Sequence, residues 1–351
     1  MQAIALRTRI AVGVAILVGI ILPFVVQNPY YQQVIVDGYI TAIAVYGLNV
    51  ILGFAGQLSL AHAAFFGIGA YVVALLTTKT SVPFWPALVL GCILTGIFGY
   101  AVGTISLRTK GHYFSIFTAA IGVMINIVFT NAQWLTNGNI GIVGIPPPPP
   151  IGPLSFDGPI AKYELVFAFL LLTIFIVAGI RHSLFGRQLL ALAGNEDLAR
   201  AAGIDVARAK RLAFLVSTVL AGLAGGLYAM YIGFLGPETT GLDTTFNMLL
   251  YAIVGGLGSI SGPLIGTLLL STLTQFLQAF EKYRMLIFGP LLILLVMYFP
   301  GGLTSGIDRL LARFAPARTR ALDPIEAESP VIAPTIGAET IAASHQGEAV
   351  L

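Results

Sequence analysis

Residues 181–211 read RHSLFGRQLLALAGNEDLARAAGIDVARAKR and carry six basic and three acidic side chains. The stretches on either side, 165–180 and 212–237, contain no Asp, Glu, Lys or Arg. A helix needs about 20 largely apolar residues, or about 17 at the short end, to cross a bilayer. The pattern therefore predicts two membrane-spanning helices joined by a charged helical segment outside the bilayer.

Composition places the whole chain among integral membrane proteins. Hydrophobic residues make up 57% of it and charged residues only 9%, and the mean hydropathy is +0.91. Soluble domains carry about 25% charged residues. We therefore expect an all-α polytopic bundle of about ten transmembrane helices. Their expected ranges are 10–27, 34–53, 58–77, 84–107, 112–132, 161–180, 211–235, 244–258, 262–280 and 285–300.

The loops between these helices differ in charge, and this difference predicts an orientation. Basic residues near helix ends are retained on the cytoplasmic side. With ten helices, the loops on the side of 181–211 hold most of the Lys and Arg residues, and the other loops hold only Lys79, Lys162, Lys282 and Arg284. Both termini and the charged segment are therefore expected in the cytoplasm. We therefore attribute the basic residues to membrane topology. The sequence shows no patch of basic and aromatic residues that would indicate binding of nucleic acid.

Three further regions complete the expected organisation. Residues 1–26 have the basic and apolar parts of a signal peptide, but no small-x-small cleavage site follows, which favours a retained first helix. Residues 133–160 contain a run of prolines, which predicts an extended extracytoplasmic connector or a docking surface for a partner. We expect a transmembrane domain over 1–310 and a disordered cytoplasmic tail, rich in Ala, Pro and Glu, over 311–351.

Two glycine-rich stretches interrupt the apolar helices. The first is GFAGQLSLAHAAFFGIGAY (53–71) and the second is GGLGSISGPLIG (255–266). Glycine lets helices pack closely, which accounts for most of these residues. Broken helices also recur at the substrate sites of transporters. If 53–62 and 255–263 are re-entrant breaks instead of turns between helices, the bundle has eight transmembrane helices.

Polar side chains occur in these stretches and on other apolar helices. An amide without a partner in hydrocarbon costs on the order of 2–7 kcal/mol, so each must face a polar group or water. A hydrogen bond between helices and a place on a substrate path both satisfy this condition. The candidate path residues are Asn49, Gln57, Ser59, His62, Asn126, Asn247 and Ser259.

The chain lacks the motifs of catalysis and of ATP binding. It has no G-x-x-x-x-G-K-[ST] phosphate loop, and Cys92 is its only cysteine. His62 has no second ligand or relay partner at a suitable spacing. Asp37 and Asp243 fall near the predicted outer ends of helices, so no mid-helix carboxylate for ion coupling is expected. We expect no catalytic residue, metal site or cofactor, and energy for pumping would come from another protein.

Two short helical runs, 186–193 and 196–202, lie within the charged segment. Asn195 is predicted to cap the second run, which carries Glu196 and Asp197 in its first turn, and Gly203 is predicted to end it. A short amphipathic helix of this kind suits docking into a groove on a soluble partner, although a solvated loop can have the same composition.

Five runs of residues occur together and in order within residues 38–304. They are GLNVILGFAGQLSLAHAAFFGIGAYVVALL (47–76), RTKGHYFSIFTAAIG (108–122), LTNGNIGIVGIPPPPP (135–150), SLFGRQLLALAGNEDLARAAGIDVARAKRLAFLVSTVLAGLAGGLYA (183–229) and GGLGSISGPLIGTLL (255–269). Through these runs the chain resembles the LivM-like permeases of branched-chain amino acid ABC importers.

The resemblance implies a multi-pass subunit of the bacterial inner membrane that translocates Leu, Ile and Val or related small neutral amino acids and amides. Its partners would be a second homologous permease, a periplasmic solute-binding protein and two cytoplasmic ATPase subunits, which would hold ATP and Mg²⁺. The charged segment would couple the permease to the ATPases. This role would fall on Gly186, Arg187, Asn195, Glu196, Asp197, Ala201, Ala202 and Gly203.

The chain departs from the family pattern within this segment. Ala193 and Gly194 stand where relatives usually have Arg-Glu, and Arg200 stands where an acid is common. These substitutions change the charges that would pair with the ATPase.

Two other classes of function are alternatives. An ion-coupled carrier or a passive channel would transport without ATPase subunits. An intramembrane enzyme would need a nucleophile or an acid beside His62, and the sequence supplies none.

Overall fold

The computed structural model describes residues 13, 16–106, 111–150, 152, 155–156, 158–278, 297, 301–304 and 306. Apart from residue 297, the expected helix at 285–300 lies outside these residues, and so does the expected tail at 311–351. The elements are α2 (Pro29–Asn49), η1 (Val50–Phe54), α3 (His62–Lys79), α4 (Phe84–Ser106), α5 (His112–Asn131), α6 (Gln133–Thr136), η2 (Gly138–Ile140), β1 (Ile142–Val143), α7 (Pro159–His182), α8 (Leu184–Gly194), α9 (Glu196–Ala201), α10 (Val206–Ile232), β2 (Phe234–Leu235), η3 (Pro237–Thr240), α11 (Leu242–Gly255) and α12 (Gly262–Gln278).

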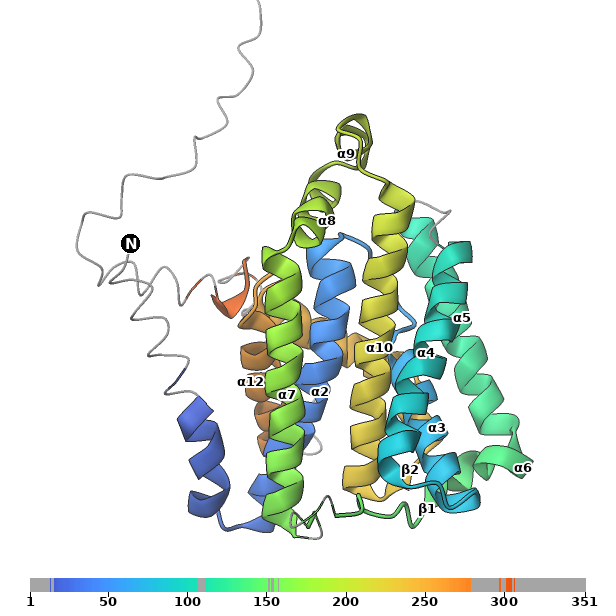
Figure 1. Ribbon diagram of the computed structural model, residues 1–351, viewed down its shortest axis with the longest axis vertical. Helices are drawn as coiled ribbons and strands as arrows, with labels where there is room; N and C mark the ends of the chain where they lie inside the picture. The colour runs from blue at the N-terminus through green and yellow to red at the C-terminus, as the bar shows by residue number, and fades with distance from the viewer. Residues whose placement is uncertain are drawn as a thin grey trace, which may run out of the picture. The chain divides into compact units, whose positions relative to one another are not determined.

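The described part of the chain is mostly helical (Figure 1). Six of its helices are long and apolar enough to cross a membrane. These candidate spans are Pro29–Phe54, His62–Lys79, Phe84–Ser106, His112–Asn131, Pro159–His182 and Val206–Ile232. A shorter apolar helix, Ile16–Val25, falls within the expected first helix. The predicted class of an all-α, multi-pass membrane protein is therefore confirmed, whereas the predicted number of helices stays a prediction.

The start of α2 differs from the prediction. The helix begins at Pro29 instead of 34, because the Asn28 side chain accepts a hydrogen bond from the Tyr30 amide at 3.0 Å and proline fits the first turn. Asp37, expected near the end of a helix, consequently lies about 12 Å inside α2, at a rise of about 1.5 Å per residue.

The centre of the bundle is built around α2 and α10. α2 packs against α7, α10 and α12, and α10 also packs against α3 and α4. Glycines make the contact between α3 and α10 close: a Cβ on Gly69 would lie 2.2 Å from the Gly222 carbonyl oxygen. The packing interpretation of the glycines holds at this crossing.

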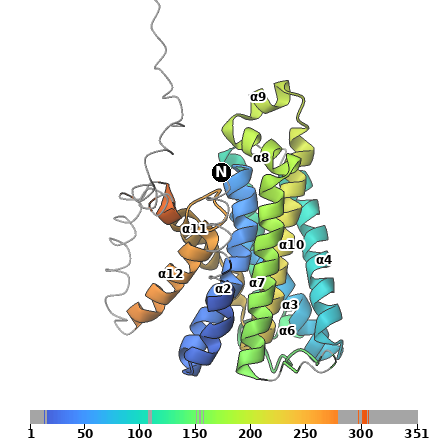
Figure 2. The same ribbon diagram turned by 60° about the vertical axis from the view of Figure 1, so that its left-hand side comes forward.

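The charged segment and the proline run lie at opposite ends of the bundle. α8 and α9 extend beyond one end, and both views place them there (Figures 1 and 2). At the other end, β1 pairs with β2 in an antiparallel register that sets Ile142 opposite Leu235 (Figure 1). The Trp85 indole donates to the Pro149 carbonyl at 3.2 Å and fixes the proline run beside α4.

Both glycine-rich stretches interrupt the helices. α2 continues into the π-helix η1, residues 55–61 are not helical, and α3 begins at His62, four residues later than predicted. Residues 256–261 separate α11 from α12 in the same way. We call residues 55–61 the first break and residues 256–261 the second break. Side chains of α5 satisfy the backbone of the first break: Ser115 donates to the Leu58 carbonyl, and Thr118 accepts from the Leu60 amide.

Candidate functional site

The joint between α7 and α8 is a single residue, Ser183. Its hydroxyl accepts a hydrogen bond from the Gly186 amide at 3.1 Å and donates to the Ile180 carbonyl at 2.7 Å. A Cβ on Gly186 would lie 2.2 Å from that carbonyl oxygen, so this tight turn requires glycine. α8 therefore begins directly after the end of α7, with only Ser183 between the two helices.

Asn195 separates α8 from α9 and caps α9 as predicted. Its side-chain oxygen accepts from the amides of Asp197 and Leu198, both at 3.0 Å. The other end of α9 also follows the prediction. Gly203 has a φ of 84°, its amide bonds the Arg200 carbonyl, and the Ile204 amide bonds the Ala199 carbonyl. This pair of bonds is a Schellman motif, which ends the helix at a left-handed residue.

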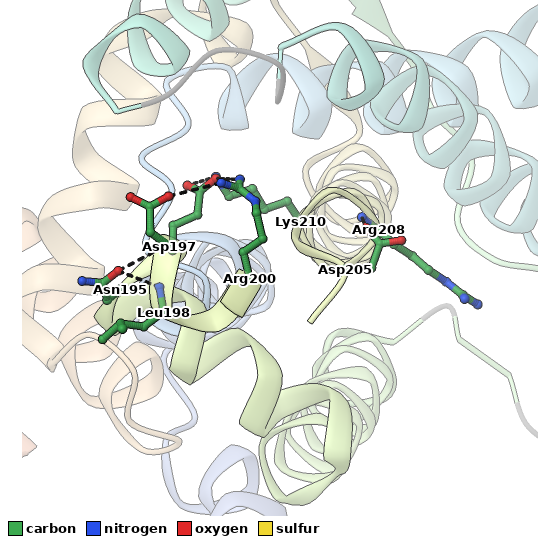
Figure 3. Close-up of polar contacts among 8 residues, drawn as sticks. Asn195, Asp197, Leu198, Arg200, Asp205, Arg208 and Lys210 are labelled. Carbon is green, nitrogen blue, oxygen red and sulfur yellow. Dashed lines mark hydrogen bonds and ion pairs between the residues drawn. The ribbon is translucent and has the colours of Figure 1, made fainter. Parts of the chain in front are cut away.

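A network of charges holds α9 against α10 (Figure 3). One Glu196 carboxylate oxygen lies 2.7 Å from the Lys210 ammonium, and the other lies 3.1 Å from the Arg200 guanidinium. Asp197 bonds Arg200 as well, at 3.2 Å. The Lys210 side chain is only 2% exposed and that of Glu196 is 23% exposed. Glu196 is therefore directed toward its own chain.

Apolar and charged side chains remain exposed on the outside of the segment. Leu184 is 73% exposed and Leu198 is 68% exposed, although both lie on helices that project from the bundle. Arg187 is exposed, and the Asp197 side chain is 80% exposed. We call these four residues the docking face. Exposed apolar patches are candidate sites for the binding of another protein.

The inner side of α8 touches the first break. Leu189 and Leu192 are buried in the core of the bundle. Gly56 has a φ of 67°, and a Cβ there would lie 3.2 Å from the Ala193 Cα atom. The C-terminal part of α8 thus rests on the first break.

Asn49 joins α2 to the second break. Its side-chain oxygen accepts from the Gly258 amide at 2.8 Å, and its side-chain nitrogen donates to the Ser259 carbonyl at 2.9 Å. The Tyr46 hydroxyl donates to the Ile260 carbonyl at 2.7 Å. The Ser259 hydroxyl accepts from the Gly262 amide at 2.9 Å and caps α12. The structure thus brings together two of the predicted path residues, Asn49 and Ser259.

The other predicted path residues do not join this pair. His62 is buried, and its Nε2 atom bonds the Ala44 carbonyl at 2.8 Å. The Asn126 side chain donates to the Pro237 carbonyl at 2.8 Å and to the Thr240 hydroxyl at 2.7 Å. Both side chains make hydrogen bonds between elements of the bundle, which agrees with the prediction that polar side chains here pair across helices.

Three candidates remain without strong hydrogen bonds. Gln57 is partly exposed in the first break, and Asn247 is exposed on α11. Ser59 is buried, and its hydroxyl has no hydrogen-bond partner within the described residues. Asn247 is therefore the one candidate in the exposed class, and Gln57 is a partly exposed candidate without a strong hydrogen bond among the described residues.

The sequence interpretation counted Arg181 and Lys210 among the basic residues of the charged segment but gave neither a place among the site residues. Both stand at the ends of apolar runs, where basic residues report topology. Their specific partners are distant in sequence, so no local spacing rule could have found them.

The comparisons with known proteins identify the family. Residues 30–296 match the family model described as the permease component of the branched-chain amino acid transport system. The chain belongs to this family. The resemblance found in the sequence is thus confirmed. No solved structure matches the chain.

Curated relatives show the same likeness. The chain is 30% identical to the high-affinity branched-chain amino acid transport system permease protein LivM of Salmonella typhimurium and to that of Escherichia coli, over 73% of this chain and 66% of each relative. It is 27% identical to the high-affinity branched-chain amino acid transport system permease protein BraD of Pseudomonas aeruginosa, over 78% of this chain and 95% of the relative. The matched part of the chain thus spans slightly less than two thirds of the LivM proteins.

Proposed function

We propose that the chain is the membrane-spanning permease subunit of an ATP-binding cassette importer. It carries Leu, Ile and Val, or related small neutral amino acids and amides, across the bacterial inner membrane. The observation that carries this proposal is the position of α8 and α9, which project from one end of the bundle while α8 rests on the first break. A segment that meets the outside on one face and a helix break on the other can transmit movement into the membrane.

The docking face binds the ATPase subunits in this proposal. Leu184 and Leu198 supply the apolar contact, and Arg187 and Asp197 supply charges around it. Glu196 acts within the chain, because it fixes α9 on α10 through Lys210. ATP and Mg²⁺ bind to two ATPase subunits, since this chain has no phosphate loop.

In the proposed topology, the chain has ten transmembrane helices and both termini lie in the cytoplasm. It is supported by the opposite positions of the charged segment and the proline run, together with the concentration of basic residues on one side. The transmembrane domain extends over 1–310 and the cytoplasmic tail over 311–351. A periplasmic solute-binding protein delivers the substrate at the end that carries the proline run.

The substrate path lies beside the partly exposed Gln57 side chain and the exposed Asn247 side chain. A polar side chain facing lipid is unfavourable, so these two residues face water or a second permease subunit. Irregular backbone within a membrane is tolerated where it lines a cavity, which applies to the first break. When the ATPases close, the charged segment moves, α7 and α10 rock with it, and the path opens to alternate sides.

Reconstitution in proteoliposomes tests the proposal. We expect uptake of labelled Leu, Ile or Val only when the chain is combined with a second permease, two ATPase subunits, a binding protein and ATP. Urea and acetamide, assayed in parallel, distinguish an amino acid importer from an amide importer. Transport by the purified chain alone would show instead a carrier or channel that works without ATPase subunits.

A further inference from the structure

Arg181 lies in the last turn of α7, directly before the joint with α8. Its guanidinium NH1 donates a hydrogen bond to the Gly258 carbonyl of the second break. The guanidinium carbon also lies 5.8 Å from the centre of the Phe54 ring, in the π-helix η1. A single side chain at the root of the charged segment thus contacts η1 and the second break.

The two peptides that flank the one bonded by Arg181 are held from α2. Asn49 accepts from the Gly258 amide at 2.8 Å and donates to the Ser259 carbonyl at 2.9 Å. Gly258 has a φ of 73°, and a Cβ there would lie 3.2 Å from the Gly53 carbonyl oxygen. Two helices therefore form hydrogen bonds with the second break: α2 through Asn49 and α7 through Arg181.

The contacts of Arg181 with Gly258 and Phe54 are of kinds that hold two elements together. Hydrogen bonds from a charged donor are shorter and stronger than those between neutral groups. A guanidinium over an aromatic face adds a further attraction of electrostatic origin. Among the described residues Arg181 forms no ion pair, so its charge is directed to the Gly258 carbonyl and the Phe54 ring.

We propose that Arg181 is the positioning residue through which movement of the charged segment reaches the second break. The proposal rests on the proposed function, in which the ATPases move this segment. When α8 is displaced, the joint at Ser183 moves the end of α7. The Arg181 side chain then changes the position of the Gly258 carbonyl relative to Asn49. The second break then changes shape together with the docking of the ATPases.

The first test measures transport per ATP hydrolysed in the complete reconstituted complex. Arg181→Ala is expected to keep assembly and basal ATP hydrolysis but to lower uptake per ATP by about tenfold, the effect of losing one hydrogen bond from a charged donor. Arg181→Lys keeps the charge without the planar face over Phe54, so an intermediate value is expected. Arg208→Ala is the matched control, because that side chain is exposed and points away from α9 (Figure 3).

Unchanged uptake per ATP in Arg181→Ala overturns the proposal, and so does an equal loss in Arg208→Ala. If Arg181→Ala does not assemble, Arg181→Lys replaces it, and unchanged uptake per ATP in that variant overturns the proposal instead.

The second test follows movement directly with spin labels. Cys92 is the only cysteine, so a Cys92→Ser background allows pairs of labels at the exposed positions Ile97, Leu190 and Leu257, none of which belongs to the docking face. Trapping the ATP-bound complex is expected to change both distances from Ile97. In Arg181→Ala only the distance to Leu190, on α8, should change. If the Leu257 distance still changes in Arg181→Ala, the link is wrong; if neither distance changes in the native chain, the proposed function itself fails.

Discussion

Among the described residues, Lys210 is the charged side chain that falls in the buried class. It is 2% exposed, and its ammonium lies 2.7 Å from Glu196. A buried charge is tolerated only with a partner, because its loss of hydration must be offset. Glu196 has a second partner, Arg200, whereas Lys210 has no other ion pair within the described residues. Loss of the pair therefore leaves Lys210 without an ion-pair partner among the described residues, whereas Glu196 keeps Arg200.

We expect Glu196→Gln to lower the free energy of unfolding more than Lys210→Met. The first change leaves a buried ammonium without a carboxylate, at a cost on the order of 3 kcal/mol. The second leaves Glu196 partly exposed and still paired with Arg200. Asp197→Asn is the control, since an exposed pair contributes roughly 0–1 kcal/mol. Thermal unfolding of the purified protein measures all three, and equal effects of Glu196→Gln and Asp197→Asn would contradict the expectation.

The α8 and α9 helices are too short to be stable on their own. They have 11 and 6 residues, below the roughly 12–15 that an isolated helix needs in water. Caps from Ser183 and Asn195 and the burial of Leu189 and Leu192 hold them in place. This arrangement fixes one side of the segment to the bundle and leaves the side chains of the docking face exposed.

Leu198→Ser is expected to weaken binding of the ATPase by about tenfold to a hundredfold. Burying a leucine contributes roughly 1.5–3 kcal/mol, and each factor of ten in affinity corresponds to about 1.4 kcal/mol. The stability of the chain should not change, because Leu198 is already 68% exposed. Titration of the purified ATPase onto the permease measures the affinity. Ile140→Ser, at the opposite end of the bundle, is the control, and an equal loss in that variant would contradict the docking face.

The two breaks free backbone groups that the membrane cannot hydrate. Asn49 satisfies an amide and a carbonyl of the second break, and Ser115 and Thr118 satisfy a carbonyl and an amide of the first. Asn49 is therefore expected to act chiefly on stability. Asn247, exposed on α11, has no such bond in the described part of the chain and is expected to act on transport.

Asn49→Leu should lower stability by roughly 1–3 kcal/mol for each of the two groups that lose their partner. Asn247→Leu should change stability by less than about 0.5 kcal/mol, as exposed substitutions usually do, but should reduce uptake. Thermal unfolding and uptake are measured on both variants. Normal uptake in Asn247→Leu would remove that residue from the substrate path.

At the scale of the whole molecule, Asp37 distinguishes two possible energy sources for transport, ATP hydrolysis and an ion gradient. It lies within α2, not at the helix end, and forms no hydrogen bond or ion pair with the described residues. Carboxylates at such positions serve ion coupling in secondary carriers. The ATP-driven and ion-coupled alternatives therefore make different predictions about Asp37.

Asp37→Asn is expected to keep ATP-dependent uptake in proteoliposomes, because the ATPases supply the energy. A protonophore should likewise leave uptake by the native complex unchanged. Loss of uptake in both experiments would favour an ion-coupled carrier. Loss in Asp37→Asn alone would give Asp37 a role in the path that does not depend on an ion gradient.

The sequence by itself determined the class of the protein, the approximate positions of most described helices, both breaks and the caps of α9. These features depend on local composition and on residues a few positions apart, such as Asn195 and Leu198. It could not place the polar side chains, because Asn49 and Gly258 or Arg181 and Gly258 meet only after the helices pack. Only the tertiary structure decided which polar groups satisfy each other and which stay exposed, since an unpaired polar group inside the bilayer accepts whichever partner packing brings within reach.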